Sequence, residues 1–104
     1  MKIFKIAVIC TMALGLVVTL ALAAGDAAKG KALFNDPKLG NGTAGVSCNT
    51  CHPNGKGLEK AGDRTDLPLF INKCIANALK GKAIDTKSAD MGDLIAYIKT
   101  LKTK

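Results

Sequence analysis

The most apolar stretch of this chain is its beginning, where an uncharged run from Ile6 to Leu22 follows the two lysines of MKIFK. The run ends in the small residues of ALAA, which is typical of the cleavage site of a secretory leader. We therefore expect a signal peptide over residues 1–23, cleaved after Ala23, and export to a bacterial periplasm. The alternative is an uncleaved membrane anchor, because roughly 17 apolar residues can just cross a bilayer.

After the leader, the hydrophobic pattern has the period of helices, and no strand-like alternation of useful length occurs. Asp26 is a suitable N-cap for a first helix, AAKGKALF, which should end near Asn35 because Pro37 disfavours helical backbone in the preceding residue. The segments 35–47 and 53–66 are rich in glycine, asparagine and charge, which predicts loops.

A second helix is predicted from Pro68 to Leu79, with Gly81 as its stop signal. Its apolar positions recur at spacings of three and four and form one stripe. The members of this stripe are Phe70, Ile71, Cys74, Ile75, Ala78 and Leu79.

The last helix is predicted to begin after Ser88 as N-cap and to run to about Leu101, with lysines near its end as the helix dipole favours. Its buried face should consist of Met91, Leu94, Ile95, Ile98 and Leu101. The pattern as a whole therefore predicts an all-α protein.

Loss of the leader changes the composition. Lys2 and Lys5 are removed, so the 15 basic residues become 13 against 8 acidic ones, and the net charge falls from +7 to +5. Three cysteines, one histidine, one methionine and three aromatic residues remain. A chain of about 80 residues with so few large side chains needs a staple such as disulfides, a metal or a large cofactor.

The only histidine of the sequence stands in the motif CNTCH, directly after two cysteines that are separated by two residues. This Cys-x-x-Cys-His pattern is typical of covalent haem c: Cys48 and Cys51 would form thioethers with the porphyrin, and His52 would bind the iron. A thioredoxin-like dithiol would need a βαβ context, a zinc site would need four ligands, and a disulfide would leave the histidine unexplained.

With this motif, residues 24–104 resemble the class I c-type cytochromes. Gly30 and Phe34 in GKALF, with Leu94 and Tyr97 in LIAYIKTL, match the family pattern in which the first and last helices cross closely. The resemblance implies a small cytochrome c fold, with three to four helices wrapped around one covalently attached haem. It also implies that Leu94 and Tyr97 lie near the haem edge.

The second axial ligand of the iron is left open between two sulfur donors. The family usually supplies a methionine from a loop before the last helix, whereas Met91 falls in the first turn of that helix and precedes Gly92. A second histidine is excluded within one chain. The other donor is Cys74, which has no partner for an intramolecular disulfide if haem consumes the other two cysteines.

A second, local resemblance favours Cys74. The stretch INKCIANALKGKAIDTKSADMGDLIAYIKTL is similar to the haem domains of thiosulfate dehydrogenases and related sulfur-oxidising cytochromes. In those domains a cysteine on the helix before the last one binds the iron, and Cys74 matches it. We therefore predict His52 as the proximal ligand, Cys74 as the distal ligand, and Met91 as the alternative distal ligand.

A haem iron with both axial positions filled is suited to single-electron transfer, so we expect an electron carrier and not an enzyme. The alternatives are a haem domain related to thiosulfate-processing enzymes and a haem-based sensor. Dispersed lysines could steer acidic redox partners, or could simply keep the protein soluble. We expect no nucleic-acid partner, and a membrane only if the leader is kept. The lysines are Lys29, Lys31, Lys38, Lys56, Lys60, Lys73, Lys80, Lys82, Lys87, Lys99, Lys102 and Lys104.

Overall fold

The computed structural model describes residues 25–103, so the predicted signal peptide and its cleavage site after Ala23 lie outside the described residues. Within this range the secondary structure consists of α-helices and short 3-10 turns, and no strand is present. The predicted all-α class is confirmed for this part of the chain. No helix in residues 25–103 has the length and apolar character needed to cross a membrane.

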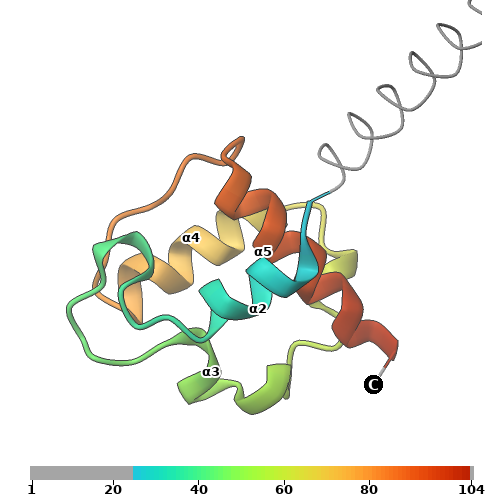
Figure 1. Cartoon of the computed structure of the whole chain (residues 1–104), viewed down its shortest axis with the longest axis horizontal. Coiled ribbons are helices and arrows are strands. Elements are labelled where there is room, and N and C mark those ends of the chain that lie inside the picture. The colour runs from blue at the N-terminus through green and yellow to red at the C-terminus, as the bar shows by residue number, and fades with distance from the viewer. Residues whose placement is uncertain (1–24, 104) are drawn as a thin grey trace, which may run out of the picture.

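Three α-helices of two or more turns make the framework: α2 (Ala27–Phe34), α4 (Leu67–Asn77) and α5 (Ala89–Thr100). A single helical turn, α3 (Cys48–Cys51), carries the two cysteines of the motif. Figure 1 shows α2 lying across α5, with α4 beside them and α3 on the connecting chain. The 3-10 turns are η1 (Leu39–Asn41), η2 (Pro53–Gly55), η3 (Ala61–Asp63) and η4 (Leu101–Thr103).

Helix α2 forms over the residues that the sequence predicts. The Asp26 carboxylate accepts hydrogen bonds from the backbone amides of Ala28 (2.9 Å) and Lys29 (3.2 Å), which satisfies two amides that the first turn leaves without helical partners. The backbone amide of Asp26 itself donates to the Asp93 carboxylate of α5 at 2.8 Å. The start of α2 is therefore tied to α5, 67 residues further along the chain.

The crossing of α2 and α5 depends on Gly30. A Cβ atom on this residue would overlap the backbone carbonyl oxygen of Asp93 and would lie 2.8 Å from the Cβ of Tyr97. One turn further along α2, the rings of Phe34 and Tyr97 pack with centroids 5.2 Å apart and planes inclined by 59°. The close helix crossing that the family resemblance implies for these residues is present.

Helix α4 differs from its prediction at both ends. It begins at Leu67 and ends at Asn77, so Ala78 is exposed and does not belong to the apolar stripe. The backbone amide of Gly81 donates to the Ile75 carbonyl at 3.0 Å, and Lys80 adopts the left-handed conformation with φ of 53°. The left-handed residue after the helix is therefore Lys80 and not Gly81. Glycine at position 81 is required by packing, because a Cβ there would lie 2.7 Å from the Gly40 carbonyl oxygen.

Helix α5 begins as predicted, because the Ser88 hydroxyl accepts a hydrogen bond from the Met91 amide at 3.2 Å. Ile95 is only partly buried, whereas Tyr97, which the helical pattern alone did not place on the buried face, is buried against α2. The buried core of the described residues is Phe34, Leu39, Leu58, Leu67, Ile71, Ile75, Leu79, Met91, Leu94, Tyr97, Ile98 and Leu101.

We predict that Gly30→Ala destabilises the protein by about 1–3 kcal/mol, because the added methyl group overpacks the helix crossing. The sign of the change in the free energy of unfolding is informative, since Gly→Ala inside a helix ordinarily stabilises by about 1 kcal/mol. Gly92→Ala in α5 is the matched control, because a Cβ there meets nothing within 4 Å. Chemical denaturation of both variants measures the effect, and equal stabilisation by the two substitutions would contradict the close crossing.

Candidate functional site

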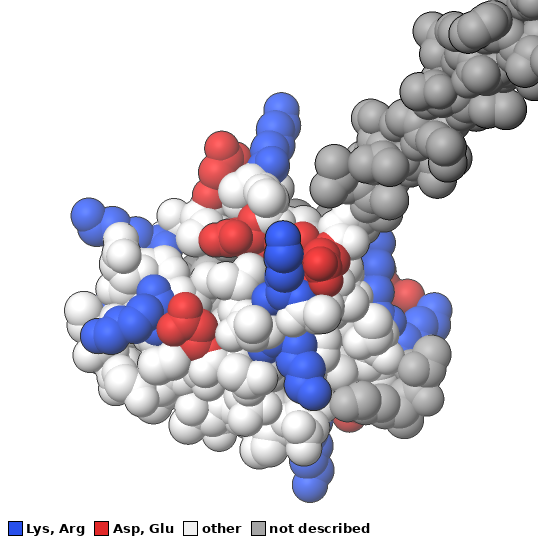
Figure 2. Space-filling view, in the orientation of Figure 1, with Lys and Arg blue, Asp and Glu red and all other residues white. Residues whose placement is uncertain are grey.

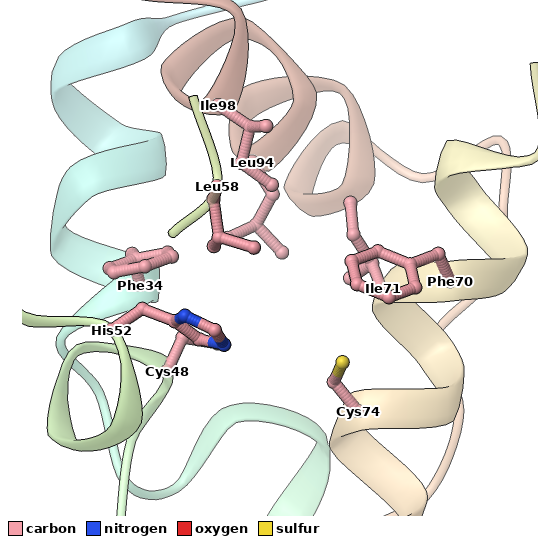
Figure 3. Close-up of a pocket in the computed structure, with 9 residues that line it drawn as sticks. All are labelled: Phe34, Cys48, His52, Leu58, Phe70, Ile71, Cys74, Leu94 and Ile98. Carbon is pink, nitrogen blue, oxygen red and sulfur yellow. The ribbon is translucent and has the colours of Figure 1, made fainter. Parts of the chain in front are cut away.

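An apolar cavity lies between α2, α3, α4 and α5 (Figure 3). The space between its walls, including open solvent at its mouth, is about 380 Å³. Residues from all four helices and from the segment after α3 form its walls, so the α2–α5 crossing supplies one side of the site. The lining residues are Phe34, Cys48, His52, Leu58, Phe70, Ile71, Cys74, Leu94 and Ile98.

The two motif cysteines on the helical turn α3 differ in how far they are exposed to solvent. Ser47 and Thr50 form a capping box, in which the Ser47 backbone amide donates to the Thr50 hydroxyl at 3.0 Å. Cys48 is half-buried and lines the cavity, whereas Cys51 is exposed. Together with Cys74 they are the three described cysteines, and all three are free thiols.

The imidazole of His52 lies at the cavity wall (Figure 3). Its Nδ1 lies 3.0 Å from the backbone carbonyl oxygen of Lys56. A carbonyl oxygen can only accept, so Nδ1 must carry the proton, and Nε2 of the neutral ring then keeps a lone pair. This is the arrangement of a histidine that binds a metal through Nε2 while its other nitrogen donates to a backbone carbonyl.

The thiol of Cys74 faces the same cavity from α4, opposite His52 (Figure 3). Burial raises the pKa of Cys74, and the nearby Cys51 adds to the rise, while Lys73 and Arg64 oppose it. The thiol is therefore protonated at neutral pH, and a metal that bound it as a thiolate would displace the proton.

Met91 does not line the cavity. It has no exposed surface, and it belongs to the hydrophobic core and not to the residues that line the cavity. The structure therefore brings together Cys48, His52 and Cys74 of the predicted site, and it leaves Met91 in the interior. Leu94 lines the cavity, whereas Tyr97 does not line it and packs against Phe34. Their place near a haem edge stays a prediction.

Sequence reasoning missed several wall residues. Leu58 lies in a segment predicted as a loop, and its only signal is that it is an isolated leucine among polar and glycine residues. The helical pattern places Phe70 on the apolar stripe of α4 but does not predict that it lines the cavity. The Arg64 guanidinium lies 4.4 Å from its ring centroid. Arg64 is held by the Asp66 carboxylate through contacts of 2.8 and 3.0 Å.

A second hollow opens on the outer side of Cys74. Arg64, Asp66, Lys73 and Asn77 line it together with Leu69, whose relative exposure of 67% is the largest for a bulky hydrophobic side chain among the described residues. Lys73 and Asn77 give this hollow a cation and an amide that can bind an anion, whereas Arg64 is already paired with the Asp66 carboxylate. Elsewhere, Figure 2 shows lysines scattered over one face of the molecule with acidic side chains among them.

The donor set at the cavity consists of one imidazole and one thiol on opposite walls, with two further thiols on α3. Among residues 25–103, no group of three or more His, Cys, Asp or Glu side chains is arranged to hold a metal ion. An iron held in a porphyrin needs only two axial protein ligands, so this donor set fits a flat, apolar, iron-containing group.

Comparisons with protein-family models, with curated proteins and with solved structures found no match to this chain. The two family resemblances seen in the sequence therefore stay predictions. The geometry of the cavity and of its donors is the basis for a functional hypothesis.

Burial raises the pKa of the Cys48 thiol from 9.0 to about 11, and the nearby Cys74 adds to the rise. The protonated thiol thus contributes stability that is present below pH 9 and is lost as the pH rises toward about 11. We expect the alkylation rate of Cys48, followed by peptide mass spectrometry, to increase with a midpoint near pH 11. A midpoint near pH 9 would show that the thiol is not buried as described.

Proposed function

We propose that this chain is a monohaem c-type cytochrome that carries single electrons between redox partners in a bacterial periplasm. The observation that carries the proposal is the apolar cavity into which the CNTCH motif directs Cys48 and His52, with Cys74 as a second donor on the opposite wall. The cavity combines one tethering thiol, a metal-binding imidazole and a water-excluding wall, and the exposed Cys51 on α3 provides the second thiol that covalent haem c requires.

The small cytochrome c fold is part of this proposal. Helices α2 and α5 cross at Gly30, and α4 closes the cavity on the side of Cys74. A bound haem would supply the missing bulk of a short chain with few aromatic residues, because burial of a large apolar group adds to the hydrophobic stabilisation.

Each residue of the site has one role in the proposed mechanism. Cys48 and Cys51 hold the porphyrin through thioethers, and His52 binds the iron through Nε2 while Lys56 orients the ring. The bound group supplies reversible one-electron oxidation of iron. The aliphatic walls around Leu94 and Ile98 exclude water from it, which favours electron transfer over binding of small molecules.

We assign Cys74 as the distal ligand in preference to Met91. Cys74 lines the cavity opposite His52, whereas Met91 lies in the core without exposed surface. Thiolate ligation is electron-donating and lowers the reduction potential, whereas a thioether ligand raises it. A carrier with this ligand pair therefore operates at low potential.

The proposed partners are redox proteins with acidic docking surfaces. The cations near the outer hollow and the excess of lysines would accelerate encounter without tight binding. Two protein ligands would suit the iron to electron transfer, so we propose an electron carrier and not an enzyme. Contact with a membrane would depend on retention of the leader.

The outer hollow supports a second candidate function, a haem domain related to thiosulfate-processing enzymes. Lys73 and Asn77 could hold a sulfur oxyanion beside Cys74. Joining two thiosulfate ions releases two electrons, however, whereas a single haem accepts one. Reduction of an artificial acceptor by purified holoprotein with thiosulfate as the only donor would favour this second function.

The first expected outcome is a gain in mass. Protein expressed with haem-attachment machinery and recovered from the periplasm should weigh one haem more than the polypeptide cleaved after Ala23. Cys51→Ala, which removes an exposed thiol at little cost in packing, should weaken or abolish covalent attachment. Recovery of a cooperatively folded wild-type protein at the bare polypeptide mass would refute the proposed function.

The second expected outcome concerns the distal ligand. Cys74→Ser should change the low-spin EPR signal and raise the reduction potential, because the thiolate is lost. The matched control is Met91→Leu, a volume-conserving change that should cost less than about 1.5 kcal/mol and leave the signal unchanged. If only the Met91 variant alters the signal, Met91 is the distal ligand.

A further inference from the structure

The loop that follows the CNTCH motif holds the His52 imidazole through a single peptide group. The carbonyl oxygen of Lys56 lies 3.0 Å from His52 Nδ1. The amide nitrogen of the same peptide group belongs to Gly57, and it donates to both carboxylate oxygens of Glu59, at 3.0 and 2.8 Å. A carboxylate, one peptide group and the imidazole therefore form one continuous chain of hydrogen bonds.

The backbone of this loop favours that arrangement. Gly57 has φ of 92°, a conformation that side chains rarely adopt. A Cβ there would lie 3.4 Å from His52 Nδ1, so the bare glycine backbone lies directly against the ring. The loop is also closed by the Gly55 amide, which donates to the His52 carbonyl at 2.8 Å. The peptide between residues 56 and 57 is thus held close to the imidazole at its carbonyl end and to the carboxylate at its amide end.

Hydrogen bonds arranged in series strengthen one another. In a trans peptide the N–H and C=O groups point in opposite directions, so a negative charge at the amide end increases the negative partial charge on the carbonyl oxygen. The Lys56 carbonyl then becomes a better acceptor for the His52 Nδ1 proton. As that bond strengthens, Nε2 becomes more basic and a stronger donor to a metal.

We propose that Glu59 is a positioning residue that sets the donor strength of His52 through the Lys56–Gly57 peptide and thereby lowers the reduction potential of the haem. The inference rests on the proposed haem function and deepens it. A stronger imidazole donor stabilises ferric iron more than ferrous iron, so the Glu59 carboxylate favours the oxidised carrier.

The test is Glu59→Gln in the holoprotein. The glutamine carbonyl can still accept from the Gly57 amide, so the loop should keep its shape while the charge is lost. We expect the equilibrium constant for reduction to rise roughly threefold, or about 28 mV at about 59 mV per tenfold for one electron. We also expect the NMR signal of the His52 Nδ1 proton in the ferrous protein to move upfield, because its hydrogen bond weakens.

Asp63→Asn is the matched control. It removes a carboxylate charge from the following turn, where Asp63 contacts Lys102 at 3.1 Å, without touching the peptide group. A through-space charge effect is screened by salt, whereas an effect carried by hydrogen bonds is not. The control should therefore leave the Nδ1 proton signal unchanged, and any shift in its potential should vanish at high ionic strength.

The outcomes separate the inference from the function on which it rests. If Glu59→Gln shifts the reduction potential even at high salt and also shifts the His52 Nδ1 proton signal, the result supports the proposed effect of Glu59 through the hydrogen-bond chain. The proposed effect of Glu59 is overturned if haem-loaded Glu59→Gln protein shows an unchanged Nδ1 proton signal, or a potential shift that disappears at high salt. Either result leaves the haem function intact. Protein that carries no haem would overturn both.

Discussion

Two helices that lie far apart in the sequence approach each other so closely at Gly30 that a methyl group there would overlap the Asp93 carbonyl oxygen. This contact places Phe34 of α2 and Leu94 of α5 on the walls of the same cavity. The hydrogen bond from the Asp26 amide to the Asp93 carboxylate holds the start of α2 in the same place. Without the crossing, the cavity would lose the wall that Phe34, Leu94 and Ile98 provide.

The loop after α3 fixes the orientation of the His52 imidazole. No regular element holds His52, because the residue leaves the helical turn with φ of −127° and ψ of 71°. Backbone atoms of the next five residues hold it instead, through the Lys56 carbonyl and the bare Gly57. A ring fixed by backbone has less freedom to turn, which suits a metal ligand whose reactivity depends on one nitrogen.

The cavity also links acid–base chemistry to ligand binding. Burial raises the pKa of the Cys48 and Cys74 thiols and keeps them protonated at neutral pH, so they are weak nucleophiles and weak ligands. Formation of the proposed site would consume the first thiol in a thioether and deprotonate the second at the iron.

Local signals in the sequence were sufficient for the helix starts at Asp26 and Ser88 and for the all-α class, since a cap acts within one turn of the chain. The CNTCH spacing likewise sufficed to single out His52. Only the tertiary structure decided that Cys74 faces the cavity while Met91 is enclosed in the core, because both lie on apolar helix faces whose partners are distant in sequence. The same reason explains Gly81, where the approach of Gly40 and not the end of α4 requires glycine.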